Sequence, residues 1–418
     1  MKIKMDYGKE GLMVDIPEES DVLLPRHKNK IKDPYNKIIN ALANPINSLP
    51  LKSIYKKGMQ VGISVCDHTR AQPRNDIVKA IIKTLEGINK NDLLIFIATG
   101  SHRQTTINEI NEMFDPYILK NSTIVIHDSE SSSNIKNIGK TSKGTPIEIN
   151  KDWISCDLKI TTGFVEPHFF AGFSGGPKMI APGLAGIETI MNLHDYERIK
   201  NANSTWGITE GNPIHEEITE ISQKIKSDFS IDVTLNREND ITGIYSGELI
   251  TEHKLARDQV KKDSMIKTNK LYDIVITSNS GYPLDQNLYQ AIKGVSAAAQ
   301  ITKPGGIIIC VSECSDGIPY DSNYEKLLKS YKNPKVFLET IKQPDFLQAD
   351  QWQFQIQAQI QKENKIMLFS KLNEKEVSDA HLTKINKVED LIEEVKLKIN
   401  KPAICVLPEG PQTIPYKA

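Results

Sequence analysis

The residues best suited to chemistry lie in one segment, 163–178, which reads Gly-Phe-Val-Glu-Pro-His-Phe-Phe-Ala-Gly-Phe-Ser-Gly-Gly-Pro-Lys. It places His168 and Lys178 on either side of a glycine-rich turn. Glycine lets backbone N–H groups approach a phosphate closely, lysine supplies a cation or a nucleophilic amine, and histidine exchanges a proton near neutral pH. The segment therefore predicts an active site that could hold a cofactor and act on a substrate.

Lys178 has more than one possible role. Its amine could hold a phosphate, or it could carry a covalent adduct if burial lowers its pKa, as in a pyridoxal phosphate enzyme. The alternative is a surface lysine without a functional role, which the preceding glycines make less favoured. The segment is not a P-loop, because Gly172 and Gly176 are too close together and Pro177 precedes the lysine. A nucleotide triphosphatase is therefore disfavoured.

Two histidines of this region are candidates for proton transfer and metal binding. His168 lies among Phe169, Phe170 and Phe173, which favour a dry pocket that shields proton transfer from water, although a core histidine is the simpler alternative. His194 ends a helix-like stretch after the lysine, and we take it as the candidate metal ligand.

Two further motifs follow apolar, strand-like runs. In Asp67-His68-Thr69-Arg70 the aspartate could accept a hydrogen bond from a ribose hydroxyl, and Arg70 could bind a carboxylate or phosphate. A capped turn whose charged side chains are solvated is equally compatible with this sequence. His102 follows the Thr99-Gly100 turn, where its imidazole could face a cleft or simply lie on the surface.

Buried strands alternating with amphipathic helices position these motifs. Apolar runs end at Cys66, Ala98, Ile126 and Thr162, and apolar residues recur at helical spacing from Asn75 to Glu86. Such alternation predicts an α/β fold with mainly parallel sheets, in which ligands bind beyond the carboxyl ends of the strands. The candidate motifs fall at those ends.

A second series of strands predicts a second α/β domain. Its apolar runs are 274–278, 305–311, 366–369 and 403–407. We expect an N-terminal cofactor-binding domain over residues 1–265 and a C-terminal domain over residues 266–418, with the active-site cleft between them. The final residues could return to the N-terminal domain.

The second domain offers a carboxylate-binding helix. Residues 281–287 predict a turn into a helix, with Asp285 as its N-cap. Gln290 and Lys293 are three residues apart and share one face near the start of the helix, which suits a substrate carboxylate. A solvated helix face is the alternative. Trp352 is expected either to line the same cleft or to pack.

Composition excludes several classes of protein. The 52 basic and 53 acidic residues of the 418 nearly cancel, which argues against nucleic acid or an anionic membrane as partner. Five scattered cysteines do not form a secretory disulfide framework, and no run of about 18 apolar residues occurs. We therefore expect a soluble, cytoplasmic protein with reduced thiols. The remaining histidines are expected to be structural or exposed: His27, His127, His215, His253 and His381.

Taken together, these motifs resemble the nickel-pincer-nucleotide lactate racemase family of 2-hydroxyacid racemases over nearly the whole chain. The resemblance rests on Asp67-His68-Thr69-Arg70, Ala98-Thr99-Gly100 leading to His102, Glu166 to Lys178 with His168, His194, and Gly281 to Asn287 followed by Gln290 and Lys293. It implies a small 2-hydroxyacid as substrate, most simply lactate, and an isomerase that depends on cofactor-maturation proteins.

The resemblance also implies a cofactor and a role for each residue. The cofactor would be the nickel-pincer nucleotide, pyridinium-3,5-bisthiocarboxylic acid mononucleotide nickel, attached covalently at Lys178, with His194 as the remaining nickel ligand. His102 and His168 would each serve one enantiomer as base or acid. Arg70, Gln290 and Lys293 would hold the substrate carboxylate. The cofactor's ribose and phosphate would be bound by these residues: Asp67, His68, Thr69, Arg70, Ser174, Gly175 and Gly176.

Other functions remain compatible with the residues. A racemase or epimerase of malate or of a larger 2-hydroxyacid could keep the same histidines. A non-catalytic carboxylate-binding protein could use Arg70 and Lys293 without redox chemistry, and it would carry neither nickel nor a cofactor.

Overall fold

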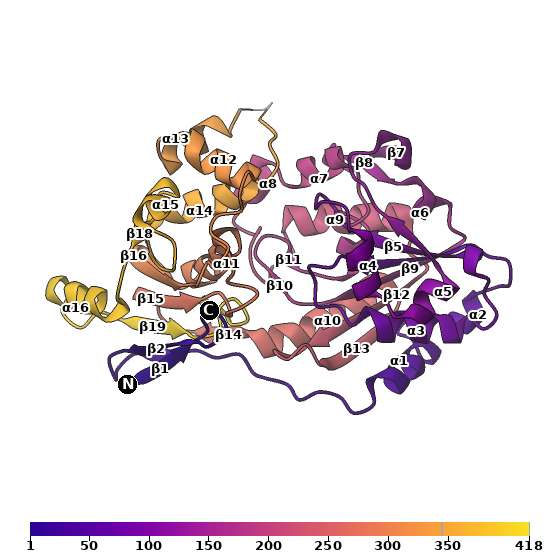
Figure 1. Cartoon of the computed structure of the whole chain (residues 1–418), viewed down its shortest axis with the longest axis horizontal. Helices are drawn as coiled ribbons and strands as arrows, with labels where there is room; N and C mark the ends of the chain where they lie inside the picture. Colours follow the sequence, from indigo (N-terminus) through magenta and orange to yellow (C-terminus); the bar gives the residue numbers. More distant parts are fainter. Residues whose placement is uncertain (344–345, 418) are drawn as a thin grey trace. The chain divides into compact units, whose positions relative to one another are not determined.

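The computed structural model describes residues 1–343 and 346–417 (Figure 1). Their contacts divide the chain into two compact units. Unit 1 comprises Met1–Arg26, Asp195–Ala202 and Lys262–Ala418, and unit 2 comprises His27–His194 and Asn203–Lys261. The division near residue 262 lies close to the expected boundary, but the first 26 residues and residues 195–202 belong to the unit of the C-terminal half.

Unit 2 is built on a six-stranded sheet with the order β13-β12-β9-β4-β5-β6 (Figure 1). Its strands are β4 (Val61–Cys66), β5 (Leu93–Ala98), β6 (Thr123–Ile126), β9 (Leu158–Phe164), β12 (Phe229–Leu235) and β13 (Ile241–Gly247). All neighbours pair in parallel except β12 and β13. The predicted strands are therefore confirmed. Two short hairpins accompany the sheet, β7 (Ile135–Lys140) with β8 (Pro146–Asn150), and β10 (Pro167–His168) with β11 (Gly172–Phe173).

The helices of unit 2 bury apolar faces against this sheet. They are α1 (Pro34–Ala43), α2 (Leu51–Ile54), α3 (Arg74–Thr84), α4 (Ile107–Met113), α5 (Pro116–Asn121), α6 (Lys151–Ser155), α7 (Ile187–Leu193), α9 (Pro213–Ile225) and α10 (Leu249–Ser264). The expected helix over 75–86 is α3, whose Ile77, Val78 and Ile81 are buried in one core with the residues of β4 and β5. The apolar residues of α3 recur at helical spacing and therefore lie on one face of the helix, the face that packs against the core.

Unit 1 contains a second six-stranded sheet, in which every neighbouring pair is parallel. Its order is β18-β17-β16-β15-β19-β3, with β3 (Asp21–Val22), β15 (Tyr272–Ser278), β16 (Thr302–Val311), β17 (Lys365–Phe369), β18 (Thr383–Lys384) and β19 (Ile404–Leu407). Two further pairs are β1 (Lys2–Met5) with β2 (Leu12–Asp15) and β14 (Met265–Thr268) with β20 (Ile414–Lys417). The expectation of two α/β units with mainly parallel sheets is confirmed.

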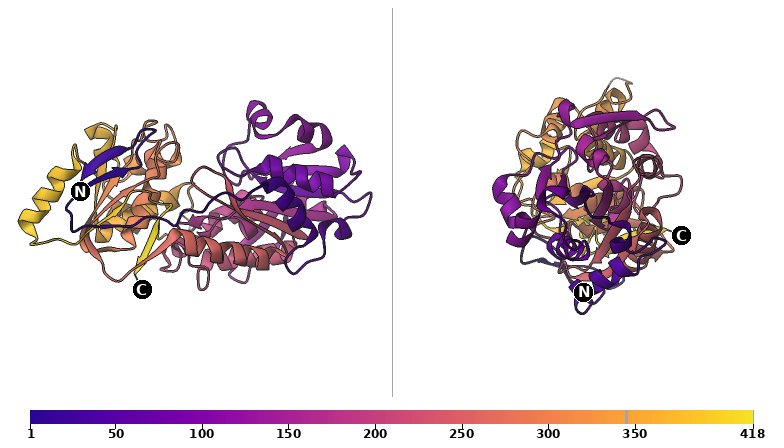
Figure 2. Two further views of the ribbon diagram at one scale, coloured as in Figure 1. Left: turned by 90° about the horizontal axis from the view of Figure 1, so that it is seen from below. Right: turned by 90° about the vertical axis from the view of Figure 1, so that its right-hand side faces the viewer.

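The helices of unit 1 include one that comes from the middle of the chain. They are α8 (Tyr196–Lys200), α11 (Leu288–Ala299), α12 (Asn323–Ser330), α13 (Pro334–Thr340), α14 (Gln351–Glu363), α15 (Glu374–Asp379) and α16 (Val388–Lys398). The buried Gln355 of α14 donates from Nε2 to the main-chain oxygen of Tyr196 at 2.9 Å, which holds α8 on this unit. Figure 2 shows the N-terminal hairpin beside α16, where the Asp15 N–H donates to Glu389.

The start of α11 differs from the sequence-based expectation. Asn287, not Asp285, is the N-cap, and its side chain accepts from the N–H of Gln290 at 3.0 Å. Asp285 is fully buried and its Oδ2 accepts from the N–H groups of Gly8 and Glu313 at 2.8 and 2.9 Å. The aspartate therefore ties two loops together rather than capping a helix.

Two expectations from composition concern cysteines and membranes. All five cysteines are unpaired and buried. Within the described residues, none of the helices has both the length and the apolar character needed to span a bilayer.

We predict that Asp285→Ala lowers the free energy of unfolding by about 2–3 kcal/mol, because two buried N–H groups lose their acceptor. Denaturant unfolding would measure the change. The exposed Asp316, in the loop after β16, offers a control: Asp316→Ala should change stability by less than about 0.5 kcal/mol. Equal effects of the two substitutions would contradict the role given to Asp285.

Candidate active site

The candidate motifs of unit 2 follow neighbouring parallel strands at one edge of the sheet. Cys66 pairs with Ala98 at the ends of β4 and β5, and Ser64 of β4 pairs with Thr161 of β9. Since parallel strands end at the same edge, the loops after Cys66, Ala98 and Phe164 emerge together. These loops carry Asp67, His102 and His168.

Asp67 and His102 form a carboxylate–imidazole pair. His102 Nδ1 lies 2.5 Å from Asp67 Oδ2, with the carboxylate almost fully buried and the imidazole about half exposed. The carboxylate holds the proton on Nδ1, which leaves the lone pair of Nε2 directed elsewhere as a possible base. The structure thus brings together two residues that the sequence suggested for different tasks.

The carboxylate of Asp67 is held in its charged form. Burial opposes its ionisation, but hydrogen bonds and charge from His102, hydrogen bonds from Thr69 and the charge of Arg70 together bring its pKa well below the usual range. Thr69 donates to Oδ1 through its hydroxyl at 2.6 Å and its N–H at 3.1 Å. The carboxylate is therefore already occupied by protein donors.

The remaining residues of this loop are engaged with their neighbours. Arg74 donates from Nη2 to the main-chain oxygens of Asp67 and Arg70, each at 2.8 Å, which shapes the loop. His68 Nε2 lies 3.2 Å from Glu109, whose pKa is lowered to about 2, mainly by its hydrogen bond with Arg103. His68 thus belongs to a partly buried polar network with Glu109 and Arg103.

His168 has the aromatic surroundings expected from the sequence. Its ring centroid lies 5.1 Å from that of Phe169 and 4.4 Å from that of Phe170. Its Nδ1 accepts from the N–H of Ala171 at 3.2 Å. The neutral ring therefore carries its proton on Nε2, in contrast to His102, whose proton is on Nδ1.

The Phe170 ring is the common neighbour of three candidate residues. The His168 ring lies 4.4 Å from it, the His194 ring 5.0 Å, and the Lys178 Nζ 5.7 Å. Each of these distances is measured to the Phe170 ring centroid. The structure therefore gathers the lysine, the candidate metal ligand and one candidate acid–base histidine around one apolar side chain.

His194 has the properties of a neutral metal ligand. It is buried, and burial together with the nearby charge of Lys178 lowers its pKa to about 4 despite a hydrogen bond to Ile190. Its Nδ1 donates to the main-chain oxygen of Ile190 at 2.7 Å, so the lone pair is on Nε2. A ligating histidine typically has its second nitrogen fixed in this way. Among the described residues, however, no three His, Cys, Asp or Glu side chains form a metal-binding group.

Two amides of the glycine-rich turn donate to other parts of the chain. The N–H of Ser174 donates to the Glu166 main-chain oxygen at 2.9 Å, and the N–H of Gly176 donates to Asp232 Oδ2 at 2.7 Å. Two of the three amides expected to hold a phosphate thus already have protein acceptors. Gly175 of this turn, together with Gly163, also leaves room for a carboxyl group.

Asp232 occupies the space that two glycines leave open. It faces Gly163 across the parallel pairing of β12 and β9. A Cβ atom on Gly163 would lie 2.6 Å from Asp232 Oδ1, and one on Gly175 would lie 2.9 Å from Oδ2. Either contact is too short for a real Cβ. The carboxyl group therefore packs directly under the turn that leads to Lys178.

Burial makes Asp232 an acid that stays protonated at unusually high pH. Desolvation raises its pKa to about 7, although the Gly176 N–H lowers it, and Oδ1 has no hydrogen-bond partner. The buried Glu252 of α10 likewise has a raised pKa, first through desolvation and then through Asp232. Its Oε1 accepts from Ser230 at 2.6 Å.

The candidate carboxylate-binding residues Gln290 and Lys293 lie in unit 1, on α11 as expected. Both are partly buried. Trp352 packs in the same unit, where it is 6% exposed and its Nε1 donates to the Tyr289 hydroxyl at 3.3 Å. The other candidates belong to unit 2.

Sequence reasoning missed several residues of this region. Asp232 was overlooked, although an aspartate inside the apolar run of β12 is a visible signal. His253, expected to be structural or exposed, is structural: it is buried, and its Nε2 donates to the Ser174 main-chain oxygen at 2.9 Å, a partner that the sequence did not indicate. His215 stacks on His253 with ring centroids 6.2 Å apart. Neither contact has a local sequence signal, because the partners are far apart in the chain.

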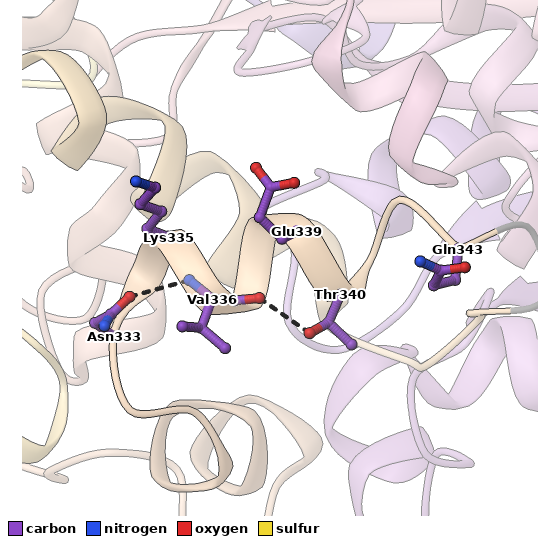
Figure 3. Close-up of a pocket in the computed structure, with 6 residues that line it drawn as sticks. All are labelled: Asn333, Lys335, Val336, Glu339, Thr340 and Gln343. Atoms are coloured by element: carbon purple, nitrogen blue, oxygen red, sulfur yellow. Dashed lines mark hydrogen bonds between the residues drawn. The ribbon is translucent and has the colours of Figure 1, made fainter.

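A depression of about 560 Å³ lies elsewhere, on unit 1 along α13 (Figure 3). It is lined by Asn333, Lys335, Val336, Glu339, Thr340 and Gln343. Figure 3 shows that Asn333 accepts from the Val336 N–H and that the Thr340 hydroxyl donates to the Val336 oxygen. These two polar side chains form hydrogen bonds with the backbone of α13. Its two titratable side chains, Lys335 and Glu339, are exposed, and Glu339 pairs with Lys342 at 2.7 Å.

We predict that Asp232→Asn flattens the pH dependence of stability. Between about pH 4 and 7 the unfolded chain has released this proton while the native protein keeps it, so native stability falls as pH rises through that window. The variant does not titrate, so between pH 4.5 and 8 its free energy of unfolding should fall by about 3 kcal/mol less than that of the wild type. Denaturant unfolding at pH 4.5 and 8 measures this, with exposed Asp258→Asn as control. An unchanged slope would show that Asp232 is already ionised in the native protein.

Comparison with known proteins assigns the family. Residues 7–207 match the lactate racemase N-terminal domain and residues 267–414 the lactate racemase C-terminal domain. Over 99% of its length the chain is 34% identical to a lactate racemase of Thermoanaerobacterium thermosaccharolyticum, covering 98% of that protein. It is 32% identical to one of Lactiplantibacillus plantarum, with 98% of each chain covered.

Solved structures agree with this assignment. The lactate racemase apoprotein of Thermoanaerobacterium thermosaccharolyticum superposes with a TM-score of 0.92 at 33% identity, covering 99% of this chain and 100% of that one. A Thermotoga maritima protein, with a TM-score of 0.68 at 17% identity over 94% of this chain and 100% of its own, shares the fold. The chain therefore belongs to the lactate racemase family and is an isomerase of that family.

Proposed function

We propose that this protein interconverts the enantiomers of lactate with a nickel-pincer nucleotide attached to Lys178. The observation that carries the proposal is the grouping of Lys178, His194 and His168 around the Phe170 ring. That grouping puts an amine for covalent attachment, a neutral imidazole for a metal and an acid–base group within reach of one small ligand. Both curated relatives are named lactate racemase, which supports lactate as the substrate.

The residues present fit such a cofactor. His194 offers an Nε2 lone pair whose orientation is fixed by Ile190, and imidazole suits nickel. Lys178 supplies the amine for a thioamide, and the loop from Asp67 to Arg70 is assigned to the ribose and phosphate of the nucleotide. Bound there, the cofactor would supply a reversible acceptor for the Cα hydride, which is the chemistry that racemisation through a planar 2-ketoacid requires.

The pair of Asp67 and His102 performs one proton transfer. His102 Nε2 accepts the hydroxyl proton of one lactate enantiomer as the Cα hydride leaves, and the ring becomes an imidazolium. Asp67 stabilises that cation through the short contact with Nδ1. Phe169 and Phe170 lie against the partly buried His168, and Phe170 also lies near Lys178, so apolar rings limit the contact of both side chains with water.

His168 is assigned to the other enantiomer, and thermodynamics constrains how the two histidines divide the work. The enantiomers have equal free energies in water, so the ratio kcat/KM must be the same in both directions at every pH. The two rings have different hydrogen-bond partners. Any resulting difference between the two directions of the reaction must therefore appear in kcat and in KM separately, and cancel in their ratio.

Substrate binding and cofactor loading complete the proposal. Arg70, Gln290 and Lys293 are assigned to the substrate carboxylate, for which a guanidinium, an amide and an ammonium group are suitable donors. Cofactor-maturation proteins are the proposed partners. Malate and larger 2-hydroxyacids serve as comparison substrates.

We predict that the matured enzyme converts L-lactate deuterated at C2 into D-lactate that keeps its deuterium in ordinary water. Hydride transfer conserves that atom, whereas removal of a Cα proton would exchange it with solvent. Chiral chromatography with mass detection measures both. Lys178→Ala and the charge-matched Lys178→Arg should lack nickel, the nucleotide mass and activity.

The same experiment can reject the proposal. Deuterium lost to solvent would exclude hydride transfer. Absence of nickel and adduct in the wild-type chain, with a control racemase matured in parallel, would exclude the cofactor. Faster turnover of malate than of lactate would reassign the substrate.

We predict that Asp67→Asn lowers kcat/KM about 100-fold or more, and equally in both directions, because the asparagine cannot stabilise the His102 imidazolium. Since the native pKa of Asp67 lies below its usual range, its contribution should be constant from pH 5 upward and be lost only in strong acid. Thr69→Ser, which keeps the hydroxyl that donates to Asp67, should cost far less. Nickel content would verify that both variants are loaded.

A further inference from the structure

A segment that follows α8, residues 206–212, packs against the hairpin of β10 and β11. The Trp206 ring centroid lies 6.0 Å from that of Phe169, in the turn of the hairpin. The Gly207 N–H donates to the Gly172 main-chain oxygen at 3.0 Å. The hairpin is therefore held from one side by a segment to which the proposed function gives no role.

Asn212 ends this segment and is fully buried. Its Nδ2 donates to the main-chain oxygens of Phe170 and Ile208 at 2.9 and 3.0 Å. Its Oδ1 accepts from the N–H groups of Ile214 and His215 at 3.0 and 3.2 Å. Main-chain oxygens can only accept and N–H groups can only donate, so these four partners fix the orientation of the amide. One side chain thus caps α9 and holds the hairpin.

The peptide group between Phe170 and Ala171 links Asn212 to His168. Its oxygen accepts from Asn212 Nδ2, and its N–H donates to His168 Nδ1 at 3.2 Å. In a trans peptide such as this one the C=O and N–H groups point in opposite directions, so the amide and the imidazole lie on opposite sides of it. Hydrogen bonds in such a chain polarise and strengthen one another. A rotation of the peptide group would break both.

The N–H of this peptide group also determines the tautomer of His168. Because Nδ1 accepts a hydrogen bond, the neutral ring has its proton on Nε2. Without that donor the ring would populate both tautomers, and the two nitrogens differ in whether they can give or take a proton. The residue whose oxygen Asn212 holds is Phe170, whose ring lies against His168.

We propose that Asn212 is a positioning residue for the acid–base histidine: through the peptide group between Phe170 and Ala171, it holds the His168 ring in one orientation and one tautomer. The effect on turnover rests on the proposed function, in which His168 exchanges a proton with the substrate. The effect on the tautomer requires neither substrate nor cofactor.

Asn212→Asp separates the two tasks of this side chain. The carboxylate keeps an oxygen for the N-cap of α9, where aspartate is also a preferred residue, but it cannot donate to Phe170. Two oxygens would then face each other, and we expect the peptide group to turn away from His168 Nδ1. Asn333→Asp makes the same exchange at the N-cap of α13, where the side chain accepts from the Val336 N–H, and is the matched control.

NMR of the chain produced with isotope-labelled histidine and without maturation proteins measures the tautomer. The imidazole nitrogen resonances distinguish a ring protonated at Nε2 from one protonated at Nδ1, and His168→Gln identifies the signals of His168. We expect the Nε2–H form in the wild type and in Asn333→Asp, and signals of both tautomers in Asn212→Asp. The buried His127, whose Nε2 lies 2.9 Å from the Ala185 main-chain oxygen, should keep its wild-type signals in each variant.

Kinetics of the matured enzyme report on turnover. We expect Asn212→Asp to lower kcat per bound nickel about 10-fold or more, because a displaced acid–base group reacts poorly even with substrate bound. KM should change by less than about 2-fold, since the residues assigned to the substrate carboxylate are untouched: Arg70, Gln290 and Lys293. Asn333→Asp should have the kcat of the wild type.

The inference requires both results. A wild-type tautomer of His168 in folded Asn212→Asp would overturn it, and so would a wild-type kcat per nickel or an equal loss of kcat in Asn333→Asp. If thermal unfolding shows that Asn212→Asp is not folded, Asn212→Ser gives the same test, because its shorter side chain can cap α9 but cannot reach Phe170. A mixed tautomer in Asn212→Asp, with a matured wild type that lacks nickel and racemase activity, would reject the proposed function and support the hold of Asn212 on His168.

Discussion

The loop that carries Lys178 depends on a carboxyl group buried beneath it. Asp232 accepts the Gly176 N–H and fits only because Gly163 and Gly175 have no side chains. His253 holds the same turn from α10 by donating to Ser174. Contacts from β12 and α10 therefore determine the position and the direction of Lys178, although both elements come more than 50 residues later in the chain.

Burying the Asp232 carboxyl group beneath this loop lowers the stability of the native protein. A carboxyl group without full hydrogen bonding is unfavourable in the interior, and its raised pKa expresses that cost. Local strain of this kind is often found close to functional groups. Here it lies two strands away from the pair of Asp67 and His102, which has the opposite character: a buried carboxylate kept charged by donors and a partner imidazole. Two aspartates at one sheet thus have their pKa values moved in opposite directions by their surroundings.

Much of the fold could be predicted because strand and helix periods are local properties. The runs ending at Cys66, Ala98 and Ile126 are strands as expected, and the helix after Arg74 begins within one residue of its predicted start. Asp285 was misassigned because a buried aspartate that ties Gly8 to Glu313 resembles an N-cap when only its neighbours are visible. The chain's first 26 residues joined the C-terminal unit through long-range pairing of β3 with β19, which no local pattern encodes.

For the candidate site, residue types were more predictable than partners. The aromatic surroundings of His168 were evident from adjacent phenylalanines, whereas the pairing of Asp67 with His102 required the register of β4 and β5. Gly175 and Gly176 were assigned to a ligand, whereas in the structure Asp232 lies where a side chain on Gly175 would be and His253 where one on Gly176 would be. A distant residue can occupy a gap that the sequence leaves unspecified.

One feature of the chain's path bears on His194. The chain leaves unit 2 at His194 and enters unit 1 at Asp195, and α8 follows at once, held to α14 by Gln355. Successive Cα atoms across a trans peptide stay about 3.8 Å apart whatever else moves. The imidazole is meanwhile fastened to Ile190 on the preceding helix. His194 is thus held on its N-terminal side by Ile190 and on its C-terminal side by the peptide link to α8. A displacement of α8 would therefore first move His194, whose ring we assign to nickel.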